Sequence, residues 1–262
     1  MIFTSTISLI LALAPTALFA APTATTDSIF NLIPRQDLPA VVYEQLKKTN
    51  ALCDLSKVVL PVGKLLPILP LHTSWMLTNT PAPTPLPAIS AGLTLRHIAI
   101  GRGTQNYTCA ASSSDAPVAA GAFATLFNAT CDTARLNVQV LTDVTKLALN
   151  YAVPTTPEAE KYKSGHHEFT EKKIPLFKLQ TDEVNYGYVQ AKPDDIKSSA
   201  PKDASTGKNG LGSVPWLKLN AVEGDYKEVF RVNTAGGVAP KTCQGITGSI
   251  TVDYSAQYWF YA

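Results

Sequence analysis

The sequence predicts a mainly β protein: an antiparallel β-sandwich or barrel-like domain, disulfide-bonded, with a short helical or irregular N-terminal segment. Nineteen prolines and fifteen glycines, with only two methionines, suit strands and turns better than helices. Short stretches of alternating apolar and polar residues are separated by turn signals, which is typical of sandwiches and barrels. Four cysteines permit two disulfides in an oxidising compartment.

The N-terminus has the pattern of a secretory signal. An apolar segment from Ile7 to Phe19 ends in small residues, and cleavage is expected after Ala20. No later stretch is predicted to span a membrane, because lysines and prolines interrupt the apolar region 55–77. The sequence therefore predicts a secreted, extracellular protein.

The composition divides the chain into three parts. Residues 1–20 are the signal peptide, residues 21–80 an N-terminal leader and packing segment, and residues 81–262 a β-rich domain. The segment NTPAPTPLP, 79–87, is expected to be extended and marks the boundary. A formal net charge of +2 without a basic stripe argues against a nucleic-acid partner.

The strands of the β-rich domain are expected at recognisable stretches. These are LTLRHIAI, TQNYTCAA, AGAFATLFNATC, HHEFTEKKIPLFKLQT, GYVQAKP, VPWLKLNA, KEVFRVNT and GSITVDYSAQYWFYA. The last alternates most clearly, with Ile250, Val252, Tyr254, Ala256, Tyr258 and Phe260 on one face. Residues 136–150 fit either a helix or a strand, and residues 194–213 are expected to form a long exposed loop.

Gly101-Arg102-Gly103, after an apolar run, resembles the start of a dinucleotide-binding turn. That fingerprint needs a third glycine opening a helix and an acidic residue about twenty positions later. Asn106 occupies the third glycine position, no helical period follows, and VAAGAFATLF stands where the acidic residue belongs. No cofactor is therefore predicted. The glycines are expected to let the strand kink or turn at a φ that only glycine tolerates.

Two N-glycosylation sequons each precede a cysteine. NYT begins at Asn106 and is followed by Cys109, and NAT begins at Asn128 and is followed by Cys131. In extended strands the sequon side chains would face outward and the cysteines inward. Glycosylation is expected at Asn106 and Asn128.

The same argument favours a disulfide between Cys109 and Cys131, which leaves Cys53 to pair with Cys243. The other pairing, Cys109 with Cys243 and Cys53 with Cys131, stays open if the NYTC and KTC segments are sheet neighbours. No C-x-x-C spacing is present, so zinc is not expected.

The stretch GHHEF is the first place to look for chemistry. In a strand, His166 and Glu168 share one face. A metal would need a third ligand, such as His97 or Asp253, and no metal site is predicted. His166 and Glu168 form, with Arg231, the candidate pocket of an enzyme.

Four aromatic residues form a candidate platform for sugar rings: Trp216, Trp259, Tyr258 and Tyr261. Exposed aromatic rings usually mark a binding surface, whereas buried rings belong to the core. The alternative for these four residues is the core of a sandwich.

Several motifs resemble, in order, the fungal branch of the domain-of-unknown-function family thirty-four fifty-five. They are GRGTQNYTC, SGHHEF followed by IPLF, VPWLKL, FRVNTAGGVAPKTC and YSAQYWFY, and they span roughly residues 80–262. The resemblance implies a secreted β-rich domain and brings no catalytic residue. Proteins of this kind are sometimes labelled malate dehydrogenase, an activity that the residues do not support.

Together these features favour a secreted, glycosylated, non-catalytic protein that acts at the cell surface, in the wall or on a host. Its expected partners are glycans or surface proteins, with glycan binding or an effector-like role. The alternative is an extracellular enzyme that acts on a polysaccharide or an ester through the His166, Glu168 and Arg231 pocket. No G-x-S-x-G nucleophile motif is present.

Overall fold

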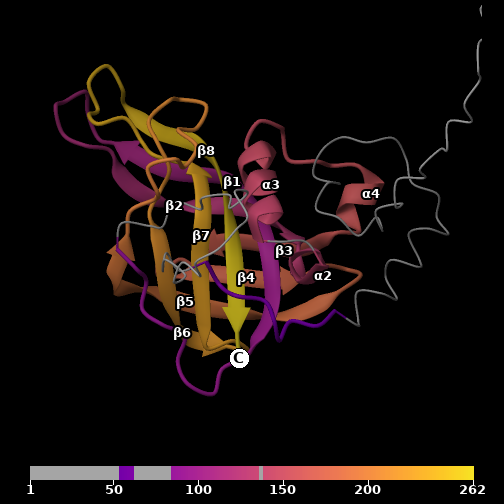
Figure 1. Ribbon diagram of the computed structural model, residues 1–262. Coiled ribbons are helices and arrows are strands. Elements are labelled where there is room, and N and C mark those ends of the chain that lie inside the picture. The colour runs from indigo at the N-terminus through magenta and orange to yellow at the C-terminus, as the bar shows by residue number, and fades with distance from the viewer. Residues whose placement is uncertain (1–52, 62–83, 136–137) are drawn as a thin grey trace, which may run out of the picture.

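The computed structural model describes residues 53–61, 84–135 and 138–262 (Figure 1). The expected signal peptide and most of the expected leader lie outside these residues. The strands are β1 (Leu95–Cys109), β2 (Val118–Asn128), β3 (Lys163–Phe169), β4 (Pro175–Gln180), β5 (Asn185–Ser198), β6 (Trp216–Gly224), β7 (Glu228–Gly236) and β8 (Gly248–Tyr261). The helices are α2 (Thr130–Arg135), α3 (Val138–Ala148) and α4 (Pro157–Glu160).

The strands close into one antiparallel barrel in chain order. β1 closes the ring because it pairs with β2 along one edge and with β8 along the other, from Leu95↔Tyr261 to Cys109↔Gly248. The prediction of a mainly β, sandwich or barrel-like domain is confirmed, and the structure is the barrel. Closure leaves no strand edge of the sheet unpaired.

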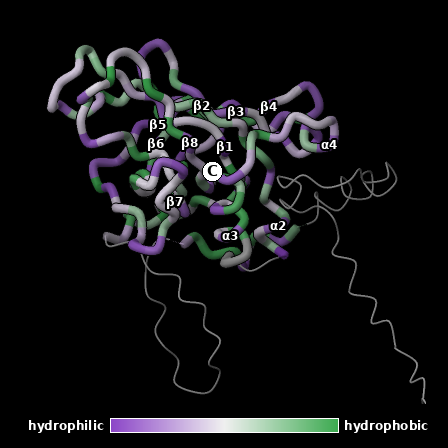
Figure 2. The backbone as a smooth tube through the Cα atoms, turned by 90° about the horizontal axis from the view of Figure 1, so that it is seen from above, coloured by the Kyte–Doolittle hydropathy of each residue, from purple (hydrophilic) through white to green (hydrophobic). Residues whose placement is uncertain are grey.

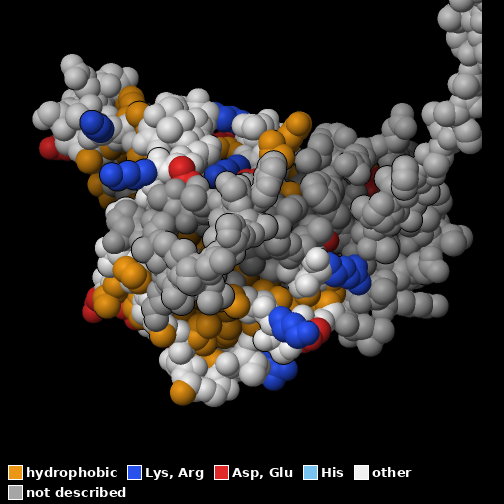
Figure 3. Space-filling view, viewed as in Figure 1, with side chains coloured by type: hydrophobic (Ala, Val, Ile, Leu, Met, Phe, Trp, Pro, Cys, Tyr) orange, Lys and Arg blue, Asp and Glu red, His pale blue; other side chains and the backbone are white. Residues whose placement is uncertain are grey.

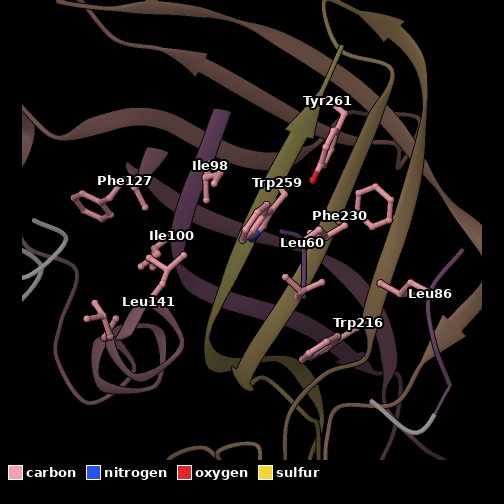
Figure 4. Packing of buried hydrophobic residues seen from close by; sticks show 14 of the residues in the cluster. Leu60, Leu86, Ile98, Ile100, Phe127, Leu141, Trp216, Phe230, Trp259 and Tyr261 are labelled. Carbon is pink, nitrogen blue, oxygen red and sulfur yellow. The ribbon is translucent and has the colours of Figure 1, made fainter. Parts of the chain in front are cut away.

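Alternation along the strands creates two apolar layers. The interior core fills the barrel and includes Phe177, Val189, Tyr258 and Phe260. The outer core lies on the outside of β1, β7 and β8 and of the adjoining ends of β2 and β6, under α3 and the segments 53–61 and 84–93. Its members include Leu60, Leu86, Ile98, Phe230 and Trp259 (Figure 4). The alternation predicted for the last strand is confirmed, since its even-numbered residues from Tyr254 to Phe260 face the interior.

Helices α2 and α3 lie together on one side of the barrel, as the view from above shows (Figure 2). Residues 138–148 form α3, so the ambiguous stretch is a helix. Leu141, Val144 and Ala148 recur at helical spacing and pack into the outer core. Figure 3 shows hydrophobic side chains gathered in the lower middle of the face on which β7 and β8 lie. In the described part of the chain, no helix has both the length and the apolar character to cross a membrane.

Gly101 and Gly103 lie within β1 and are paired on both sides, so no helix begins there. Neither has a positive φ, and the expected kink is therefore wrong. A Cβ atom on Gly101 would lie 2.6 Å from Cε2 of Tyr258, and one on Gly103 would overlap the backbone oxygen of Phe123. The two glycines are required because neighbouring groups approach too closely for any side chain.

Replacing Gly103 with alanine is expected to lower the free energy of unfolding by about 3 kcal/mol, because the obstacle is strand backbone. Gly101→Ala meets a side-chain ring and is expected to cost less, about 2 kcal/mol. Urea unfolding measures both. Val118→Thr, at a position of β2 that is 67% exposed, is the control and should stay within about 0.5 kcal/mol of the wild type. A Gly103→Ala protein as stable as this control would contradict the close-approach explanation.

Arg102, between the two glycines, faces outward and holds the end of α3. The side chain is buried, and Nε donates to the carbonyl oxygens of Ala148 at 3.1 Å and Tyr151 at 3.2 Å. Nη1 donates to the carbonyl oxygen of Gly103 at 2.8 Å and to Oδ1 of Asp253 at 3.2 Å. The last carbonyls of a helix have no partner within it, so the guanidinium caps α3 on the barrel. The Gly-Arg-Gly stretch is thus a structural motif.

The disulfides join Cys53 to Cys131 and Cys109 to Cys243. The favoured pairing of Cys109 with Cys131 is wrong, and the alternative pairing is the one formed. The NYTC and KTC segments are indeed neighbours, since the backbone N–H of Cys243 donates to Asp115, in the loop that follows β1.

The antiparallel register explains this correction. Thr108 pairs with Val118, whereas Ala99 pairs with Asn128. Cys109 and Cys131 therefore lie at opposite ends of the β1–β2 hairpin, about 30 Å apart at roughly 3.3 Å per residue. The second sequon is also not an extended strand, because β2 ends at Asn128 and α2 begins two residues later.

The described N-terminal segments belong to the fold. Leu60, seven residues after Cys53, is buried in the outer core. Lys218 of β6 and Glu228 of β7 form a buried ion pair, with 2.7 Å between Nζ and Oε1. The segment around Ser90 is bound to this pair. The Ser90 hydroxyl also donates to Glu228, and Lys218 donates to the carbonyl oxygen of Ala88. Burial raises the pKa of the Glu228 carboxyl, but the bonds from Lys218 and Ser90 outweigh it and leave the pKa below its usual value.

The expected exposed loop at 194–213 begins later than predicted, because β5 continues to Ser198. The register of β5 with β6 shifts twice, between Gln190 and Ala191 and, at a longer bend, between Pro193 and Lys197. Residues at this bend are exposed or half-buried.

Candidate functional site

In the described part of the chain, α2 and α3 pack over β1, β7 and β8, whereas the outward side chains of β4 and of the parts of β2, β3 and β5 around Phe123, His166 and Tyr188 are exposed or half-buried. We call this surface, with the adjoining end of β6, the open face. It is defined by six outward-pointing residues: Phe123, His166, Glu168, Lys178, Tyr188 and Glu223. Their inward-pointing neighbours, such as Ala124, Phe177 and Val189, belong to the interior core. Strict alternation along these strands therefore places the polar and aromatic residues on one surface.

Two rows of side chains cross the open face. Register pairs His166 with Lys178, and Lys178 with Tyr188. The next row pairs Glu168 with Leu176, Leu176 with Gln190, and Gln190 with Glu223. Side chains opposite each other in a sheet lie close enough to interact, so each row acts as a connected strip.

Both ends of the open face carry an aromatic ring. Phe123 is 49% exposed, and its ring stacks on His166 with the centroids 5.9 Å apart. Tyr188 is 37% exposed, and its hydroxyl donates to Oε1 of Glu223 at 3.0 Å. This hydrogen bond and the charge of the carboxylate raise the pKa of the Tyr188 hydroxyl. The tyrosine therefore keeps its proton and remains a hydrogen-bond donor at neutral pH.

Polar groups between the rings are oriented by one another. Nε2 of His166 lies 3.4 Å from Oε1 of Glu168. The amide of Gln190 donates to Oε2 of Glu223 at 3.1 Å. The face thus offers two rings, an imidazole, carboxylates and an amide, which suits a ligand that has both apolar faces and hydroxyl groups.

The candidate pocket of His166, Glu168 and Arg231 is not assembled. His166 and Glu168 lie together on the open face. Arg231 occupies the inward side of β7, two residues from Val229 of the interior core, and its Nη2 donates to the carbonyl oxygen of Pro215 at 2.9 Å. The barrel wall separates Arg231 from the other two residues, so the sequence prediction of a shared pocket is wrong.

The candidate aromatic platform is also wrong. Trp216, Trp259, Tyr258 and Tyr261 are at most 4% exposed. Tyr258 belongs to the interior core, and the other three belong to the outer core (Figure 4). Tyr258, Trp259 and Tyr261 are buried because both sides of β8 are covered, one by the barrel interior and the other by α3 and the N-terminal segments. Trp216, at the start of β6, is buried in the same outer core.

The other described histidines are buried. His97 lies between the hydroxyl groups of Ser164 and Thr130, and burial lowers the pKa of His97 to about 3. Burial likewise lowers the pKa of His167 to about 4, although its hydrogen bond to Leu176 raises the pKa in part. Both imidazoles are therefore neutral at physiological pH.

The residues considered as further metal ligands do not converge with His166. Asp253 is paired with Arg102 and with Lys208, at 3.2 Å and 2.8 Å. No group of three His, Cys, Asp or Glu residues that could hold a metal ion is found within residues 53–61, 84–135 and 138–262.

The two sequons differ in their surroundings. Asn106 is partly exposed and accepts a hydrogen bond from the Thr104 hydroxyl at its carbonyl oxygen, an atom that does not carry the sugar. The amide nitrogen of Asn128 donates to the Tyr186 hydroxyl at 3.2 Å. A sugar on Asn128 would be attached to the same nitrogen that contacts Tyr186, whereas the nitrogen of Asn106 has no such contact among the described residues, so Asn106 is the better placed acceptor.

Sequence reasoning missed Phe123 and Tyr188. The available signal was the alternation of AGAFATLF and NYGYVQAK, in which each ring has small or aliphatic neighbours. Small residues pointing inward leave the aromatic residue between them on the outside.

Comparison with known proteins gives a family and no activity. No curated protein and no solved structure matches the chain. A family described as "Protein of unknown function (DUF3455)" matches residues 89–262. This match covers all eight strands and both cysteines of the Cys109–Cys243 disulfide, and on that basis the chain belongs to the DUF3455 family.

Proposed function

We propose that this chain is a secreted, N-glycosylated, non-catalytic protein that binds polysaccharide at a cell surface, in a wall or on a host through the open face. Two exposed aromatic rings on one surface of a sheet carry this proposal. Pyranose rings present flat apolar faces that stack on such residues, and their hydroxyl groups bond to neighbouring carboxylates and amides. Glu223 and Gln190 stand beside Tyr188 in this arrangement.

Secretion and glycosylation are supported by the sequence and by the disulfides. The signal pattern of residues 1–20, the two sequons and the absence of free cysteines among the described residues fit an oxidising extracellular compartment. The enzymatic alternative rested on a shared pocket of His166, Glu168 and Arg231. Arg231 lies on the other side of the barrel wall from the other two residues, so this support is gone.

A retention assay tests the binding proposal. The full chain is produced in a eukaryotic secretory host, and protein recovered from the medium is mixed with insoluble chitin, cellulose and β-glucan. We expect the wild type to be retained by at least one of these polymers. Phe123→Ser combined with Tyr188→Ser should reduce retention at least tenfold, because the stacking surfaces are gone.

Tyr151→Ser is the matched control, since Tyr151 is 39% exposed but lies after α3, away from the open face. Its retention should equal that of the wild type. The proposal fails if no polymer retains the wild type, or if the double variant is retained as well as the control.

A further inference from the structure

A basic groove lies beside the open face. The turn between β3 and β4 and the second half of β5 line this groove, which has a volume of about 560 Å³. Four lysines surround it: Lys172 and Lys173 from the turn, and Lys192 and Lys197 from β5. All four are exposed. We call this feature the lysine groove.

The four groove lysines have no carboxylate partner among the described residues, and they are gathered around one groove. Lys163, Lys208 and Lys218 each form an ion pair with a glutamate or aspartate. The side-chain ammonium groups of the four groove lysines form no ion pair or hydrogen bond with any residue in the described ranges. Like charges gathered in one groove repel one another, and an anionic ligand would relieve that repulsion.

Two aspartates in the groove do not cancel its charge. Asp194 accepts hydrogen bonds from the backbone N–H of Ile196 at 3.1 Å and from the amide of Asn220 at 3.0 Å. Asp195 is the second acidic residue of the lining. Four lysines and two aspartates leave a net charge of +2 in the groove.

The groove continues the open face along β5. Tyr188, Gln190 and Lys192 point outward at alternate positions of this strand, since Val189 and Ala191 face the interior core. Tyr188 and Lys192 are thus about 13 Å apart along the strand, at roughly 3.3 Å per residue. One extended polymer can therefore contact the aromatic ring and the lysines at the same time.

We propose that the lysine groove binds the carboxylate groups of an acidic polysaccharide whose chain runs along β5 onto the open face. This inference rests on the proposed function and narrows the ligand to polymers that contain uronic acids. Ile174, Pro175 and Pro193 give the groove apolar surface for sugar rings. No aromatic residue stands among the described residues that line it, and single-stranded nucleic acids need such rings for base stacking.

Binding of two matched oligosaccharides tests the inference. The probes are an oligogalacturonate of about ten sugars and the same oligomer with its carboxyl groups methyl-esterified, measured by calorimetry with the full secreted protein. We expect the acidic oligomer to bind at least tenfold more tightly, with an affinity that falls as salt is added. Lys192→Gln combined with Lys197→Gln should remove this preference. Lys227→Gln combined with Lys241→Gln removes the same amount of charge at exposed positions outside the groove. This control protein should keep the preference for the acidic oligomer.

The outcomes separate this inference from the proposed function. If both oligomers bind equally and both depend on Tyr188, the groove inference is overturned and polysaccharide binding stands. If neither oligomer binds and the insoluble polymers also fail to retain the protein, both proposals are overturned. Tighter binding to a single-stranded DNA of equal charge than to the uronate would also overturn the inference.

Discussion

Replacing both Cys109 and Cys243 with alanine is expected to lower the free energy of unfolding by about 5 kcal/mol. The disulfide links residues 134 positions apart, and on the loop-entropy model a cross-link of that span restricts the unfolded chain by about this amount. Alanine is chosen because both cysteines are buried and a serine hydroxyl would lack a partner there. Denaturant unfolding of the oxidised proteins measures the difference.

The second disulfide supplies the comparison. Cys53 and Cys131 are 78 positions apart, so their joint replacement is expected to cost slightly less, about 4.5 kcal/mol. Replacing Cys109 together with Cys131 would break both bridges in this structure and should be the most damaging of the double replacements. If that protein were the most stable of the three, the connectivity described above would be incorrect.

Arg102→Ala is expected to cost about 3–5 kcal/mol. The change leaves the carbonyl oxygens at the end of α3 and the Asp253 carboxylate without their buried cationic partner. Arg102→Lys should recover only part of this loss, because one ammonium group cannot reach the acceptors that the planar guanidinium spans. Thermal or urea unfolding, with helical circular dichroism, reports both the stability and the state of α3.

Arg96→Ala is the control for Arg102, since Arg96 is exposed on the same strand. It should change stability by no more than about 0.5 kcal/mol. If the Arg102→Ala protein were as stable as the Arg96→Ala control, α3 would not depend on the guanidinium.

The sequence by itself determined the class of the fold and most of its strands. Turn residues and alternating apolar residues are local properties, and they predicted strand in the regions of all eight strands. The stretch HHEFTEKKIPLFKLQT, expected as one strand, forms β3 and β4, whereas LTLRHIAI and TQNYTCAA, expected as two, belong to β1. The interior face of β8 followed from alternation alone. Glycine, however, has two uses that sequence cannot separate. Gly101 and Gly103 were expected to supply an unusual φ, whereas they provide space for Tyr258 and for the backbone of β2.

The tertiary structure decided which surfaces are covered and which cysteines meet. Closure of the barrel depends on the pairing of β1 with β8, which lie more than a hundred residues apart. That pairing brings the loop after Cys109 to Cys243 and moves Cys131 to the far end of the hairpin. The sequence leaves Trp259 and Tyr261 open between exposed rings and core residues, and distant segments, α3 and residues 53–61, cover them. Phe123 and Tyr188 stay exposed because no segment within residues 53–61, 84–135 and 138–262 packs over β2 and β5 there. Alternation fixes the side of a strand on which a residue lies, and only long-range packing determines whether that side meets solvent.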